Sequence, residues 1–191
     1  MKRVFLAAAG VVTATVLAGT ATADATPSTQ TASHKTIAAS SSQTEVPAAA
    51  ASRVSRTNIV RIARSQLGYA ERGTTNCTKY GPCEEWCSLF ATWVWRRAGV
   101  AIPKYAFTGD VYRWGLRHHL AYGKGALRRA KPGDVLLFGT GPGNTRTSTH
   151  IGIVEKVSGG RVTLIEGNSA NKVRRRSYAL TARTFYGGVR P

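Results

Sequence analysis

The sequence predicts one α+β domain in which N-terminal helices pack on an antiparallel β-sheet. Two observations carry this prediction. Apolar residues before residue 100 follow helical spacing, and short β-branched runs after residue 130 are separated by glycine-rich turns. Helices followed by strands joined through hairpins are typical of this fold class. We expect the domain to cover residues 53–191, a length sufficient for its own hydrophobic core.

The first 23 residues have the parts of a secretory signal peptide. Lys2 and Arg3 form a positive start, an apolar run covers residues 4–19, and residues 21–23 (ATA) give a small-residue cleavage pattern. A membrane anchor is the alternative, but the run is short for a bilayer span. We therefore expect a secreted protein, extracellular or associated with the cell wall, that meets a membrane only transiently during export.

Residues 24–52 consist mostly of Ala, Ser, Thr, Pro and Gln. This composition buries too little apolar surface to offset the entropy of ordering the chain. The segment is therefore expected to be a disordered linker or a pro-segment that precedes the domain.

Two helices and a shorter one are expected in the first half of the domain. Helical spacing within residues 59–67 indicates the first, and Gly68 suits its C-terminal end. The second is expected over residues 86–98, where apolar residues form one face and Gly99 ends the helix. A short helix around residues 110–116 fits the pattern less well, because three glycines interrupt this region.

The second half of the domain changes to the pattern of β-strands. Each expected strand is a short apolar run, and glycine-rich turns separate the runs. The four runs are KPGDVLLFG (131–139), THIGIVEKV (149–157), GRVTLIEGNS (160–169) and RTFYGGVRP (183–191).

The chain carries a formal net charge of +18 and has a sequence pI near 10.8. Such a protein is attracted to polyanions, among which anionic wall polymers, phospholipid surfaces and peptidoglycan carboxylates are candidates. The basic residues are scattered and form no recognisable nucleic-acid motif, so no specific nucleic acid is expected. The alternative is that the charge serves solubility alone.

The three cysteines divide into a pair and a single thiol. Cys77 and Cys83 flank a short irregular loop, which can bring their Cα atoms to bridging distance, and disulfides persist outside the cell. Cys87 lies at a helix start, where first-turn N–H groups favour a thiolate. Glu84 and Glu85 disfavour that anion, so a further stabiliser is needed, ideally a histidine.

Zinc binding is the alternative role for the cysteines. Their spacing, C-x5-C-x3-C, lacks the paired C-x-x-C or H-x-x-x-H pattern of structural zinc sites. We therefore expect no metal and no cofactor.

His150 is the histidine with suitable neighbours. If Val157 faces Arg161 across the predicted hairpin, then His150 faces Asn168, with Glu166 on the diagonal and all three side chains on one face. A carboxylate and an amide beside a histidine fix its tautomer and stabilise the imidazolium. The alternative is that Glu166 merely ends its strand at the surface.

Four motifs together resemble the CHAP domain, the family of cysteine, histidine-dependent amidohydrolases/peptidases related to NlpC-type and papain-like enzymes. They are Trp86-Cys87 at a helix start, residues 132–134 (PGD) before a strand, His150 opening the next strand, and residues 166–168 (EGN) ending the one after. The resemblance covers roughly residues 58–191. It implies a papain-like CHAP fold.

The resemblance also implies roles for these residues. Cys87 is then the nucleophile, His150 the base, Glu166 the orienting acid and Asn168 the fourth member of the site, while Trp86 beside the nucleophile is expected to bind substrate. The Cys77–Cys83 pair is not a general mark of the family.

The function implied is a secreted cysteine peptidoglycan hydrolase, either an N-acetylmuramoyl-L-alanine amidase or a peptidoglycan endopeptidase. It would act as a monomer on peptidoglycan and anionic wall polymers. Two alternatives remain: a non-enzymatic basic protein that binds wall polymer or another protein on a CHAP scaffold, and a papain-like acyl transferase.

Overall fold

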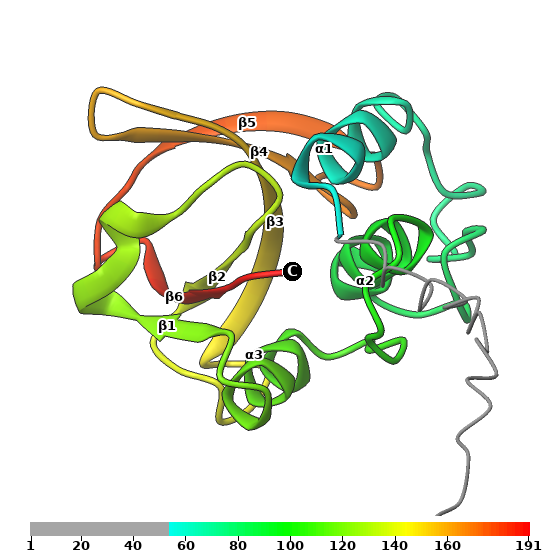
Figure 1. The fold of residues 1–191 in the computed structure, drawn as a ribbon. Helices are drawn as coiled ribbons and strands as arrows, with labels where there is room; N and C mark the ends of the chain where they lie inside the picture. Colours follow the sequence, from blue (N-terminus) through cyan, green and yellow to red (C-terminus); the bar gives the residue numbers. More distant parts are fainter. Residues whose placement is uncertain (1–53) are drawn as a thin grey trace, which may run out of the picture. The chain divides into compact units, whose positions relative to one another are not determined.

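The computed structural model describes residues 54–191 (Figure 1). The predicted signal peptide and linker lie outside the described residues. The helices are α1 (Arg56–Arg64), α2 (Cys87–Arg97), α3 (Thr108–Arg117) and the 3-10 helix η1 (Lys124–Arg129). The strands are β1 (Ala121–Gly123), β2 (Val135–Gly139), β3 (Ser148–Ser158), β4 (Arg161–Glu166), β5 (Arg174–Ala179) and β6 (Phe185–Val189).

The strands form one antiparallel sheet in the order β1-β6-β2-β3-β4-β5. The predicted α+β class, with N-terminal helices on an antiparallel sheet, is thus confirmed. Strand β6, the last in the chain, lies between β1 and β2, so the C-terminal run fills an interior position of the sheet. The C-terminal run thus pairs with the first two strands of the chain.

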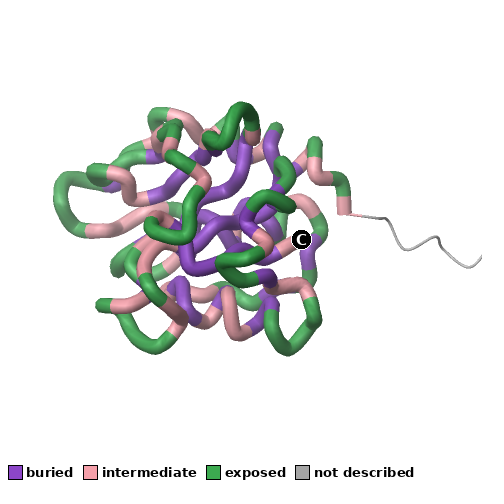
Figure 2. The backbone as a smooth tube through the Cα atoms, turned by 90° about the vertical axis from the view of Figure 1, so that its left-hand side faces the viewer, coloured by how far each residue is buried: buried purple, intermediate pink, exposed green. Residues whose placement is uncertain are grey.

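Apolar side chains are buried on both faces of the sheet. Residues such as Leu137, Ile151 and Ile153 pack against the helices, whereas Leu136 and Val154 join a second cluster that contains Leu127 and Phe185. In Figure 1, α1 and α2 lie on one side of β3, and β1 and η1 lie on the other side. Figure 2 shows buried segments through the middle of the domain and exposed backbone in the outer turns.

Neighbouring residues account for the start of α1 and the end of α2. Ser55 precedes α1, and its hydroxyl accepts a hydrogen bond from the Asn58 backbone N–H. This helix ends at Arg64, earlier than predicted, and tight turns occupy residues up to Gly68. Helix α2 matches its predicted range closely, and Gly99 beyond it adopts a left-handed φ of 95°.

The hairpin of β3 and β4 differs from the predicted register at its turn. The turn is the Gly159-Gly160 pair, both at positive φ, so Ser158 faces Arg161. Two glycines at positive φ suit the twist of a two-residue hairpin. The predicted pairing of Val157 with Arg161 is therefore wrong by one position.

A bulge then restores the predicted register nearer the candidate site. The pairing shifts between Val154 and Lys156, so that Glu155 has no direct partner on β4. Beyond the bulge, Val154 faces Leu164 and Ile153 faces Ile165. This end of the hairpin continues toward His150 on β3 and Glu166 on β4.

Across residues 54–191, no helix combines the length and the apolar character needed to cross a membrane.

Candidate active site

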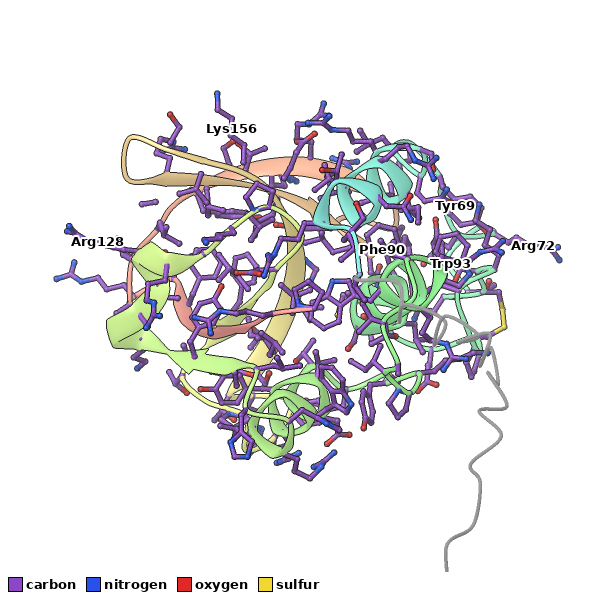
Figure 3. All side chains as sticks on the ribbon, viewed as in Figure 1. Tyr69, Arg72, Phe90, Trp93, Arg128 and Lys156 are labelled. Atoms are coloured by element: carbon purple, nitrogen blue, oxygen red, sulfur yellow. A yellow bond between two sulfur atoms is a disulfide. The ribbon has the colours of Figure 1, made fainter. Side chains whose placement is uncertain are left out.

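Helix α2 begins at Cys87. Trp86 precedes the helix with an irregular backbone and no side-chain cap, so the first-turn N–H groups have no acceptor from a capping side chain. Cys77 and Cys83 form a disulfide across a Cα–Cα distance of 4.0 Å, which Figure 3 draws as a yellow bond. Cys87 is a free thiol. The Cys87 residue is only 8% exposed, so it is buried among the core residues.

His150 lies near the start of β3, opposite Phe138 on β2. Its Nε2 is 3.1 Å from Oε2 of Glu166. The Cys87 side chain also acts on the ring, since its hydrogen bonding and charge raise the pKa of His150. The imidazole therefore interacts with both the thiol and the carboxylate.

The protonation of His150 reflects these two neighbours. Burial by itself lowers the pKa of an imidazole, but the hydrogen bonds and charges of Cys87 and Glu166 outweigh burial and raise the pKa of His150 to about 10. The ring is thus an imidazolium at neutral pH.

Glu166 ends β4 and is 1% exposed, so it does not end the strand at the surface. Its Oε2 accepts hydrogen bonds from His150 and from the Tyr178 hydroxyl at 3.2 Å. Burial and the adjacent carboxylate raise the pKa of Tyr178 to about 12, so the phenol keeps its proton and donates. Within the described residues, Oε1 of Glu166 has no hydrogen-bond partner.

Two glycines let these elements approach. A Cβ on Gly167 would collide with the Phe90 side chain of α2, and a Cβ on Gly152 would lie 3.0 Å from Cγ of Glu166. Both contacts are too close for any larger residue. The helix that carries Cys87 can therefore lie against the end of β4, and Glu166 can pass beside β3 toward His150.

Asn168 does not hydrogen-bond with His150. Its Nδ2 donates to Oε2 of Glu85 at 2.7 Å, and Oδ1 of Asn76 lies 3.5 Å from the same nitrogen. The backbone of Asn168 is in the left-handed region, with φ of 53°, because the chain turns away directly after Glu166. Asn168 therefore links the end of β4 to the segment before α2.

Trp86 cannot take the substrate-binding role predicted for it. The residue is 0% exposed, and its indole N–H donates to Oε2 of Glu71 at 2.8 Å. Its ring also stacks on Tyr80. A side chain enclosed on every side has no surface for a substrate, so Trp86 is a packing residue that holds the start of α2.

Sequence reasoning missed Tyr178 and Phe138. Tyr178 lies in a strongly basic stretch, RRRSYA, that carries no strand signal. Phe138 packs against both the His150 and Tyr178 rings, at centroid distances of 5.3 and 5.0 Å. In the sequence, Phe138 is one apolar residue among several in its predicted strand, so no local pattern marks it as a site residue.

The arrangement is a linear chain of thiol, imidazole and carboxylate. His150 interacts with Glu166 through Nε2 and also with Cys87, and nucleophilic catalysis by cysteine uses this order of groups. Within residues 54–191, no three His, Cys, Asp or Glu side chains are grouped to hold a metal ion.

The sequence model of the CHAP domain family matches residues 72–168, just over half of the chain. The chain belongs to the CHAP domain family. The matched range of this CHAP domain contains Cys87, His150 and Glu166, whereas α1, β5 and β6 lie outside it.

Several solved structures resemble the CHAP chain at low sequence identity. NlpC1 from Trichomonas vaginalis is 17% identical, with a TM-score of 0.45, over 71% of this chain and 43% of that one. Ly7917 is 18% identical, with a TM-score of 0.45, over 72% and 62%. A protein of the NLP/P60 family, similar to a lipoprotein, from Staphylococcus aureus subsp. aureus Mu50 is 16% identical, with a TM-score of 0.44, over 71% and 40%.

The CHAP chain spans less than two thirds of the length of these solved structures. No curated protein sequence shows significant similarity to it.

Proposed function

We propose that this protein is a secreted cysteine peptidoglycan hydrolase that cuts an amide or peptide bond of the bacterial cell wall. One observation carries the proposal: the His150 ring interacts with both the free Cys87 thiol and the buried Glu166 carboxylate. Membership of the CHAP family, the cysteine, histidine-dependent amidohydrolases/peptidases, supports the reaction type.

The first step is acylation. The Cys87 thiolate attacks the amide carbonyl and forms a C–S bond, and the carbonyl oxygen becomes an oxyanion. First-turn backbone N–H groups of α2 point toward that oxygen's position and stabilise its charge. The His150 imidazolium then gives its proton to the leaving amine as the C–N bond breaks.

The second step is deacylation. Neutral His150 takes a proton from water, and the resulting hydroxide attacks the thioester and releases the carboxylic acid and the thiolate. Glu166 keeps the ring oriented and stabilises its charge in both steps without itself taking a proton. Tyr178 holds Glu166 in place through its hydroxyl.

The substrate class follows from the family and from the predicted signal peptide, which would bring the chain to the wall. The domain arrangement proposed is a signal peptide over residues 1–23, a linker or pro-segment over 24–52 and the CHAP domain over 53–191. The protein is proposed to act as a monomer without a cofactor.

The test is hydrolysis of purified peptidoglycan by the isolated protein. Product mass spectra identify the bond through the new amine and carboxylate ends. We expect wild-type protein to release fragments, Cys87→Ala to release none while still binding walls, and iodoacetamide to modify Cys87 in the non-reduced protein. Ser88→Ala is the matched control, because the Ser88 hydroxyl is buried and has no hydrogen-bond partner within the described residues.

The outcomes separate the alternatives. Clearing of walls by Cys87→Ala would overturn the nucleophile assignment. An unreactive Cys87 with intact wall binding would indicate the non-enzymatic protein. Products formed only with an added amine acceptor would indicate the acyl transferase.

A further inference from the structure

Negative charge is almost absent from the surface of the described domain. Residues 54–191 contain 23 Lys and Arg but only seven Asp and Glu. Four of the seven acids are buried: Glu71, Asp134, Glu155 and Glu166. Each of the four already binds an internal partner. The exposed basic side chains therefore have few carboxylates to neutralise them.

Basic residues converge on two adjoining cavities beside α1. The larger has a volume of about 580 Å³ and lies between α1 and the turn before β2; its lining includes Arg61, Val60 and Pro132. The smaller, of about 300 Å³, is lined by Arg56, Arg129, Lys131 and Arg190. Arg56 and Lys131 line both, so the two cavities adjoin, and together they are here called the basic groove.

A buried carboxylate fixes the wall of the basic groove. Asp134 is 0% exposed, pairs with the Arg56 guanidinium and accepts a hydrogen bond from the Lys131 backbone N–H at 3.0 Å. Arg56 also donates to the Pro132 carbonyl at 3.0 Å. Helix α1 and the turn before β2 are thus held at a fixed separation, and the groove exists without a ligand.

Four cations of the basic groove keep their charge available. Within the described residues, Arg61, Arg129, Lys131 and Arg190 have no acidic partner. Arg129, Lys131 and Arg190 line the smaller cavity together, and Arg61 lies in the larger one. A chain of anions that runs through both cavities can meet all four cations, whereas a single phosphate ion in the smaller cavity can meet only three of them.

The side chains in and around the basic groove favour one class of polyanion over the others. Leu116 on α3 is the large hydrophobic side chain that the described residues expose, so apolar anchors for a lipid bilayer are missing beside the groove. Among the described residues that line the two cavities, none is aromatic, so bases have no platform on which to stack. A polymer of phosphodiesters without bases fits both facts.

We propose that the basic groove binds a phosphodiester-linked wall polymer of the teichoic type. The groove is separate from the candidate active site, since Glu155 at its edge is five residues along β3 from His150, roughly 17 Å of extended strand. The polymer would thus anchor the domain on the wall while the active site remains open. This inference rests on the proposed action at the cell wall.

The test measures binding of the full-length Cys87→Ala protein to purified poly(glycerol phosphate) and to insoluble walls before and after their phosphodiesters are stripped. The groove variant carries Arg61→Gln, Lys131→Gln and Arg190→Gln. The matched control removes three exposed charges elsewhere, with Lys104→Gln, Arg128→Gln and Lys156→Gln; Arg128 and Lys156 project from the ribbon away from α1 (Figure 3). Thermal unfolding verifies that both variants are folded.

We expect the groove variant to bind the polymer about 10- to 100-fold more weakly, since each basic residue near an anionic surface contributes on the order of fivefold. The control should stay within about threefold of the parent protein, and stripped walls should bind the parent weakly. Equal losses in both variants, or no loss in the groove variant, would overturn the site. RNA that binds tenfold tighter than the polymer at equal phosphate content would overturn the polymer class.

A second measurement separates this inference from the proposed function. With Cys87 restored, the groove variant should hydrolyse a small soluble muropeptide as fast as wild type, because that substrate carries no polymer. Loss of both binding and hydrolysis would indicate general damage and overturn the groove assignment. Failure of wild type to hydrolyse would overturn the proposed function, while the polymer-binding result would still decide the groove.

Discussion

His150 is the side chain through which the other members of the candidate site act. In the proposed mechanism it receives the Cys87 proton, while Glu166 contacts its Nε2 and contributes to its raised pKa. The nucleophile and its base act as a unit, so removing either should remove the same catalytic step. The carboxylate acts only through the ring, so its loss should cost less.

We therefore expect His150→Ala to lower kcat/KM on peptidoglycan as much as Cys87→Ala, on the order of a thousandfold or more. Glu166→Gln should lower it by about 10- to 100-fold, the usual cost of losing an orienting partner. His119→Asn is the control, because His119 is exposed at a left-handed φ that asparagine tolerates. A Glu166→Gln loss larger than that of His150→Ala would contradict the assigned roles.

The charge of His150 also makes stability depend on pH. Its folded pKa, about 10, lies above the ordinary value of 6.5, so the folded state binds this proton more tightly than the unfolded chain does. The resulting stabilisation is complete below about pH 6.5 and is lost as pH rises toward 10. We expect the Tm of wild type to fall over that range.

The comparison protein for this prediction is Glu166→Gln, which removes one of the charges that raise the His150 pKa. Its Tm should fall less between pH 6.5 and 10, measured by scanning calorimetry in matched buffers. Parallel curves for the two proteins would show that His150 is not the titrating group.

At the scale of elements, the site depends on how closely α2 approaches the end of β4. Gly167 lies at that contact, where the Phe90 side chain leaves no room for a Cβ. Phe90 is labelled in Figure 3. Overpacking at such a position shifts the backbone and costs about 1 to 3 kcal/mol. Here the shift would also separate Cys87 from His150.

Gly167→Ala should therefore destabilise the domain by about 1 to 3 kcal/mol and lower activity more than tenfold in the fraction that remains folded. Urea unfolding and hydrolysis of walls measure the two effects. Gly125→Ala provides the matched control, since a Cβ there meets no atom within 4 Å. An active, fully stable Gly167→Ala protein would show that this contact does not set the site.

The elements also show what sequence could and could not predict. The runs around 135–139, 148–158 and 161–166 were apolar because the sheet buries both faces there, and they were found. Strand β5 was missed because it lies at an edge and exposes its arginines, which erases the apolar pattern. At the bulge, Glu155 forms ion pairs with Arg64 and Arg175, and such tertiary contacts cannot be inferred from the local sequence pattern.

For the candidate site, reasoning from the sequence identified the residues that belong to chemical motifs. It missed the residues whose contribution depends on where the fold places them. Cys87, His150 and Glu166 were proposed from their residue types and spacing. Tyr178 reaches Glu166 only because β5 pairs with β4, which no local pattern indicates. Trp86 was assigned to substrate because it neighbours Cys87, yet the helix start turns its ring into the core.

At the scale of the whole molecule, the net charge of +18 dominates long-range behaviour. Attraction between exposed charges weakens as salt shortens the Debye length. The fraction of Cys87→Ala protein bound to insoluble walls should therefore fall steeply from about 0.05 to 0.5 M salt, as pull-down assays would show. Binding that ignores salt would point to a carbohydrate or peptide pocket instead.

The types of cation in the basic groove determine how pH and salt would act on the protein. Three of the four unpaired groups are arginines, which keep their charge at any pH a cell wall meets, whereas the proposed chemistry depends on one imidazole. A rise of pH toward 10 would then neutralise the imidazole and lower turnover, while the arginines keep their charge and the protein stays bound. A rise in salt concentration would weaken wall binding without changing the protonation of His150, so pH and salt would each control one of the two proposed activities.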